Sequence, residues 1–128
     1  MVNETQAQDY APQTLQVQSL SDIIFAENEY RYEFMESEAR AIDATNPPFV
    51  ALKLSDGRIA TVFRGRGKHI QKAQTMARGD ETQYVPALMH LLVRVNGAQL
   101  PAEDFADLWA TDYTAILIEV QSPKAGNF

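Results

Sequence analysis

Residues 49–63, FVALKLSDGRIATVF, constrain the fold more than any other stretch of this sequence. Apolar or β-branched residues alternate with others on both sides of Ser55-Asp56-Gly57, and a period of two is typical of a β-strand. Asp and Gly tolerate the positive φ angles of a tight turn. The stretch therefore predicts a β-hairpin. The alternating positions are Val50, Leu52 and Leu54 on one strand and Ile59, Thr61 and Phe63 on the other.

Weaker strand signals precede the hairpin. Leu15 and Val17 alternate in TLQVQSL, and Tyr30, Tyr32 and Phe34 alternate with charged residues, as in a half-buried strand. Residues 37–48 break the alternation, are compatible with one helical turn, and end in Asn-Pro-Pro.

The period changes from two to about 3.6 after the hairpin. Residues 70–77 show helical spacing, Gly79 is suited to end that helix, and Asp80 is suited to cap the next one. Pro86 in a helix interior would cost about 3 kcal/mol. Two alternatives remain open: the helix kinks there, or its regular part begins near Tyr84. The apolar stripe of this second helix comprises Val85, Leu88, Met89, Leu92 and Val95.

The last third of the chain predicts a turn at Asn96-Gly97, a short helix over residues 101–109, and a final helix capped by Thr111. The apolar sides of these helices are Phe105, Leu108 and Trp109 in the first and Tyr113, Ile116, Leu117 and Val120 in the second.

Strands followed by helices predict an α+β fold, in which antiparallel strands precede a small bundle of three to four helices. We expect a single domain over residues 13–121, with mainly strands over 13–63 and mainly helices over 66–121. We expect residues 1–12 to be disordered and residues 122–128 to form a flexible tail.

Composition excludes several classes of chemistry. The chain of 128 residues contains no cysteine, which rules out disulfides, thiol catalysis and cysteine-bound zinc. The N-terminus lacks the apolar run of a signal peptide, and no segment approaches the roughly 20 apolar residues of a membrane span. We expect a soluble cytoplasmic protein.

Charge is unevenly distributed. The formal net charge is −6, yet residues 53–78 contain seven basic residues and one acid. Within residues 64–78, RGRGKHIQKAQTMAR, the basic residues are Arg64, Arg66, Lys68, Lys72 and Arg78. Three interpretations stay open: a solvated strand-to-helix junction, which we favour; a phosphate or nucleic-acid site; and a docking face for an acidic protein.

No catalytic or cofactor motif is recognisable. The glycines around Arg66 do not match a P-loop or a dinucleotide fingerprint. His69 and His90 lack metal-ligand spacing, no serine lies in a GxSxG context, and no carboxylate pair is placed for acid–base catalysis. Trp109 is expected in the core. We predict a non-enzymatic protein without metal or cofactor.

Residues 49–121 resemble the small tail assembly chaperones of long-tailed bacteriophages, especially those of Mu-like prophages. The matching features, in order, are the hairpin, the basic GKHIQKAQTMARGD, the apolar TQYVPALMHLLVRV, the link NGAQLPAEDFADL and the helix ATDYTAILIEV. These features are structural and include no catalytic residue.

The resemblance implies a protein of the bacterial host cytoplasm that coats the long helical tape-measure protein before the tail tube forms. Its partners would be the tape-measure and tail tube proteins, with nucleic acid and membranes not expected; homo-oligomerisation stays open. The candidate partner-binding residues are Arg64, Arg66, Lys68, Lys72, Leu88, Met89, Leu92, Tyr113 and Leu117. The apolar ones among them are either exposed for a partner or part of the core, and the sequence leaves both alternatives open.

Two other hypotheses remain. One is a structural tail or baseplate component whose N-terminal strands join a neighbour's sheet edge. The other is a small nucleic-acid-binding regulator that uses residues 64–78.

Overall fold

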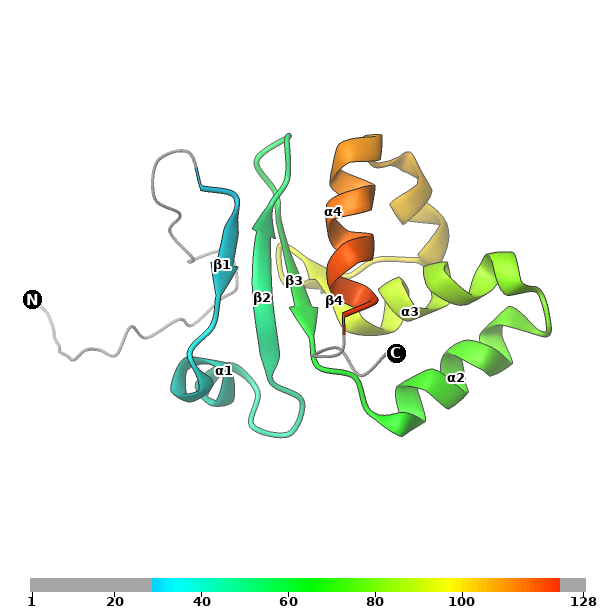
Figure 1. Cartoon of the computed structure of the whole chain (residues 1–128), viewed down its shortest axis with the longest axis horizontal. Helices are drawn as coiled ribbons and strands as arrows, with labels where there is room; N and C mark the ends of the chain where they lie inside the picture. Colours follow the sequence, from blue (N-terminus) through cyan, green and yellow to red (C-terminus); the bar gives the residue numbers. More distant parts are fainter. Residues whose placement is uncertain (1–28, 123–128) are drawn as a thin grey trace, which may run out of the picture.

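An antiparallel five-stranded sheet organises the protein. The computed structural model describes residues 29–122, and the strands lie in the sequential order β1-β2-β3-β4-β5. Along the chain, α1 lies between β1 and β2, and α2 and α3 lie between β3 and β4. Figure 1 shows α2, α3 and α4 on the same side of the sheet. The α+β prediction is confirmed. The strands are β1 (Arg31–Glu33), β2 (Pro48–Lys53), β3 (Ile59–Phe63), β4 (Val93–Val95) and β5 (Ala98–Gln99).

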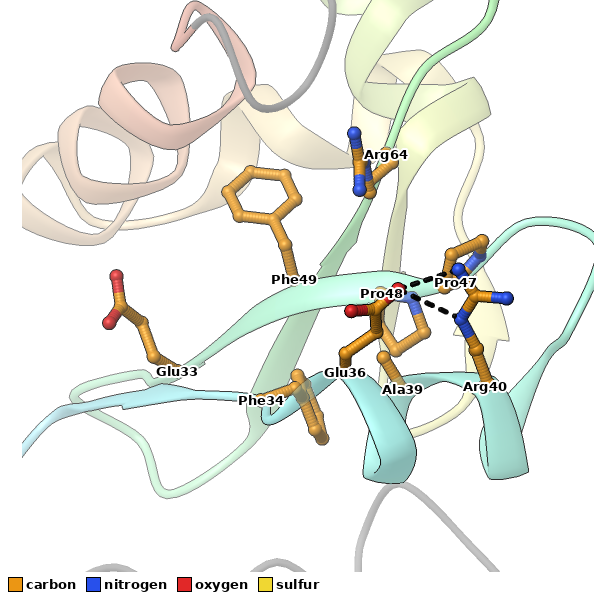
Figure 2. A pocket seen from close by; sticks show the side chains of 9 residues that line it. All are labelled: Glu33, Phe34, Glu36, Ala39, Arg40, Pro47, Pro48, Phe49 and Arg64. Carbon is orange, nitrogen blue, oxygen red and sulfur yellow. Dashed lines mark hydrogen bonds and ion pairs between the residues drawn. The ribbon is translucent and has the colours of Figure 1, made fainter.

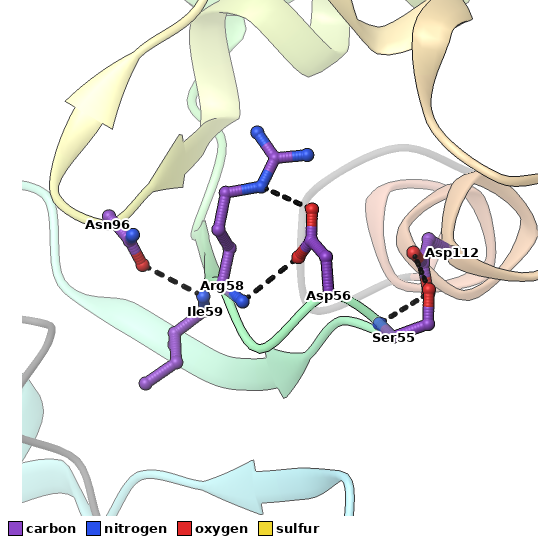
Figure 3. A network of polar contacts seen from close by, with 6 residues as sticks. All are labelled: Ser55, Asp56, Arg58, Ile59, Asn96 and Asp112. Atoms are coloured by element: carbon purple, nitrogen blue, oxygen red, sulfur yellow. Dashed lines mark hydrogen bonds and ion pairs between the residues drawn. The ribbon is translucent and has the colours of Figure 1, made fainter.

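The predicted hairpin is formed by β2 and β3, with Ala51 opposite Thr61. Gly57 has a φ of 91°, which only glycine adopts without strain, and its N–H donates to the Leu54 carbonyl over 2.9 Å. The Asp56 carboxylate accepts hydrogen bonds from the N–H and the guanidinium of Arg58, which closes the turn (Figure 3). The alternating pattern is typical of a strand with one buried face, but all five residues of β3 are buried.

The helices α2, α3 and α4 cover one face of the sheet. Residues from this face and from α2, α3 and α4 form the main core, whose largest fully buried side chains include Phe105, Leu88, Met89, Leu92 and Ile116. The segments are α1 (Glu36–Ile42), α2 (Gly67–Ala77), the 3₁₀ turn η2 (Glu81–Gln83), α3 (Tyr84–Leu92), the 3₁₀ segment η3 (Ala102–Asp107) and α4 (Ala110–Val120).

The opposite face of the sheet carries a second, smaller cluster. Tyr32 and Phe34 pack against Ala51 and Ile59, and their rings meet edge to face at 5.3 Å. The strand predicted at residues 30–34 is thus present as β1. The helix after it, α1, has seven residues and is longer than the single predicted turn.

The junction between α2 and α3 follows the sequence signals. Arg78 and Gly79 both adopt positive φ and end α2, and the Asp80 carboxylate accepts from the Thr82 N–H over 3.0 Å. Pro86 is the third residue of α3, where a helix N–H has no intrahelical acceptor. The second alternative is therefore correct: the regular helix begins at Tyr84.

The prediction that the apolar helix continues to Val95 is wrong. The helix ends at Leu92, and Val93 and Val95 belong to β4, where they lie opposite Val62 and Ala60. β-branched residues are well suited to a buried strand, and the Asn96-Gly97 turn, with both φ angles positive, closes the hairpin to β5. The predictions for residues 1–28, including the weak strand at 13–19, and for residues 123–128 lie outside the described residues.

Candidate functional site

A basic junction connects β3 to α2. Arg64, Arg66, Lys68 and Lys72 are all exposed there, as their sequence pattern predicted. The Arg66 N–H donates to Nδ1 of His69 over 2.9 Å, so His69 caps the start of α2 in its neutral form. Partial burial lowers the pKa of His69, and the positive charges of Lys68, Arg66 and Lys72 lower it further.

Three arginines from separate segments meet at this junction. Arg40 of α1, together with Arg64 and Arg66, lines a hollow of about 370 Å³, and no carboxylate lines it. The Arg66 guanidinium donates to the Thr45 carbonyl, and the Arg64 N–H donates to the Pro47 carbonyl over 3.0 Å. These bonds hold the loop before β2 against the junction.

A second hollow, of about 330 Å³, adjoins the first and shares Arg40, Pro47 and Arg64 with it (Figure 2). Its walls combine apolar and charged side chains. They are formed by Phe34, Ala39, Pro48 and Phe49, together with Glu33 and Glu36. We call the two hollows together the arginine groove.

The outward face of α4 is a different surface. Trp109 is 73% exposed just before the helix, and Ile118 is 62% exposed near its end. Ile118 borders a shallow groove whose other lining side chains are small, those of Ala110, Thr111, Thr114 and Ala115, and Ala110 directly follows Trp109 in the sequence. We call Trp109 and these five residues the α4 face.

The expectation that Trp109 lies in the core is wrong. Leu108 and Trp109 connect η3 to α4 with non-helical backbone angles, ψ of 154° and 148°, so neither side chain continues a helical stripe. Leu108 packs against the main core and Trp109 faces outward. Thr111 is not the cap of α4, which begins at Ala110.

The predicted apolar partner residues are mostly part of the core. Leu88, Met89 and Leu92 are no more than 1% exposed, because α3 is enclosed by α2, α4, η3 and the sheet. Tyr113 and Leu117 are half-buried and pack against the same core. For these five residues the core alternative holds, and the exposed apolar position on α4 is Ile118.

The buried carboxylates connect secondary structure. Asp112 accepts from the N–H and hydroxyl of Ser55 over 3.0 and 2.7 Å, which fastens the hairpin turn to α4 (Figure 3). Glu119 accepts two hydrogen bonds from Arg31, over 2.7 and 3.2 Å, which fastens β1 to the end of α4. Both carboxylates therefore take part in contacts that hold the fold together.

Within residues 29–122 no cluster of histidine and carboxylate side chains is arranged to hold a metal ion. The helices of this part of the chain are too short or too polar to cross a bilayer. No protein-family model matches the sequence, and neither a curated protein nor a solved structure matches it. Any assignment of function therefore has to come from the arginine groove and the α4 face.

Proposed function

We propose that this protein is a non-enzymatic tail assembly chaperone of the bacteriophage type, which binds the helical tape-measure protein before the tail tube forms. The observation that carries the proposal is the α4 face, where Trp109 and Ile118 are 73% and 62% exposed. The sequence resemblance supplies the kind of partner.

The small side chains of the α4 face support the proposal that a partner helix packs there. Ala110, Thr114 and Ala115 are small, and the distance between packed helices depends on the side chains at the contact. Ile118 borders this groove and Trp109 directly precedes Ala110, so both can act as large anchors; tryptophan is enriched among residues that dominate binding energy. Full burial of a side chain of the size of Ile118 is worth about 1.5–3 kcal/mol.

Charge specifies the partner further. The segment η3, which ends two residues before Trp109, exposes Glu103, Asp104 and Asp107. Complementary charges steer association and exclude wrong partners. The partner helix should therefore carry an apolar stripe flanked by lysine or arginine.

Co-expression with the tape-measure protein encoded in the same gene neighbourhood tests the proposal. The tagged wild-type protein should recover the tape-measure protein, and a Trp109→Ala/Ile118→Ala variant should recover at least about tenfold less, since two anchors are lost. The matched control is Tyr30→Ala, which removes a 63% exposed aromatic ring from another surface. Equal recovery by both variants would contradict the assignment of the α4 face.

The other hypotheses give different outcomes in the same experiment. A chaperone is missing from purified phage tails, so stable incorporation would indicate a structural component. Recovery of nuclease-sensitive nucleic acid in place of a helical protein would indicate a regulator that uses residues 64–78. Either result would overturn the proposal.

A further inference from the structure

We propose that the arginine groove is a second protein-binding site, which takes a pair of carboxylates from an acidic segment together with the apolar side chain next to them. The groove shares no lining residue with the α4 face. The inference therefore goes beyond the proposed function and does not depend on it.

The arginine groove contains hydrogen-bond donors that a ligand can use. Within residues 29–122, no hydrogen bond or ion pair involves the Arg64 guanidinium, so its planar set of N–H groups is available to a ligand. Arg66 donates to a neutral carbonyl and keeps its full charge. Arg40 pairs with Glu36 at 2.6 Å, but both side chains are more than 60% exposed, and exposed pairs are weak. Guanidinium groups bind carboxylates through two parallel hydrogen bonds.

The groove is also preorganised. Its walls come from α1, from residues 44–49 and from the start of the segment after β3, which the Arg66–Thr45 and Arg64–Pro47 hydrogen bonds hold together. Two consecutive prolines, Pro47 and Pro48, restrict the backbone of one wall. Little ordering is therefore needed on binding, and such preorganisation favours affinity.

The apolar side chains of the second hollow determine which ligand residue can lie next to the carboxylates. Ala39, Pro48 and Phe49 line this hollow together with Arg64 (Figure 2). An aromatic or aliphatic side chain next to the acids can bury its surface there, while the acids reach Arg40, Arg64 and Arg66. The ligand that fits is an acidic peptide segment with an adjacent apolar residue.

Charge around the groove favours such a peptide over nucleic acid. Glu33 and Glu36 line the second hollow and would repel a phosphate chain that continued along the groove. The whole protein has 17 acids against 11 basic residues, which opposes binding of a long polyanion. The aromatic rings that line the groove, Phe34 and Phe49, are at least partly buried, which limits base stacking.

Calorimetric titration of the full chain with a capped Glu-Glu-Phe peptide tests this site. We expect saturable binding that weakens with salt, and binding at least about tenfold weaker for a Gln-Gln-Phe peptide, which cannot form charge-assisted bonds. Arg64→Ala should weaken binding of the acidic peptide by about tenfold or more, and Arg64→Lys should restore it only in part. Lys72→Ala is the matched control, because it removes a charge from the same basic segment outside the groove; it should change affinity less than about twofold.

Equal binding of the two peptides would overturn the proposal, as would no binding of the acidic peptide by the folded protein. A single-stranded oligothymidylate that binds more tightly than the peptide and loses affinity in Arg64→Ala would show a nucleic-acid site instead. Inorganic phosphate that competes fully at low millimolar concentration would show a site for small anions only. None of these results alters the test of the α4 face.

Discussion

At the scale of single residues, one histidine links protonation to the start of α2. His69 accepts the Arg66 N–H through Nδ1, and it can do so only while that nitrogen is unprotonated. The sequence showed His69 among basic residues, which explains part of its lowered pKa. The capping contact could not be predicted, because glutamate or glutamine is the usual residue at this position of a capping box.

We therefore expect the protein to lose stability as pH falls from 7.5 to 5. The pKa of His69 is lower in the folded state than in the unfolded chain, so the unfolded chain binds more protons in this range. Stability from this group is complete above the unfolded pKa of about 6.5 and is lost as pH falls through the folded pKa. Thermal melts of wild type and His69→Gln should show a smaller pH effect in the variant, where an amide oxygen caps at every pH. An identical pH dependence would contradict this role.

At the scale of secondary-structure elements, some helix and strand ends are set by tertiary contacts that cannot be read from the sequence. The hairpin and the C-terminal end of α2 were predictable, since turn and cap residues act locally. The end of α3 was not, because Val93 and Val95 fit a helical stripe and a strand equally well, and pairing with β3 decided between them. The two valines follow a helix without a break, so only Asn96-Gly97 signalled the hairpin.

Asn96 should be important for that hairpin. Its side-chain oxygen accepts from the Ile59 N–H over 2.9 Å, and its φ is 51°. Asn96→Ala loses the bond and strains the backbone, and should lower the free energy of unfolding by about 1.5–3 kcal/mol. Asn96→Gly keeps the backbone conformation and should cost less. Urea unfolding that ranks the variants in the opposite order would refute this explanation.

Asp112 should fasten the hairpin turn to α4. Asp112→Ala leaves the Ser55 N–H and hydroxyl without their acceptor, and we expect a loss of about 1–3 kcal/mol in the free energy of unfolding. The control Asp107→Ala changes an exposed carboxylate nearby and should stay within about 0.5 kcal/mol of wild type. Equal losses in the two variants would show that the Ser55 contact does not stabilise the fold.

At the scale of the whole molecule, the fold class followed from the order of strands and helices, and the basic junction from its charge pattern. The partner surfaces did not. Arg40 lies 24 residues before Arg64 in sequence, so only the tertiary structure brings it into the arginine groove. Ile118 lies outside the apolar stripe predicted for the last helix, but nothing in the sequence indicated that it belongs to a partner surface.

We propose above that the α4 face binds a helix of the tape-measure protein. Trp109 is the sole tryptophan and is 73% exposed, so its fluorescence reports directly on that face. The most direct measurement is its emission spectrum during titration with tryptophan-free helical fragments of the tape-measure protein. We expect a saturable shift to shorter wavelength as the indole leaves water. Binding detected by calorimetry with an unchanged Trp109 spectrum would contradict it.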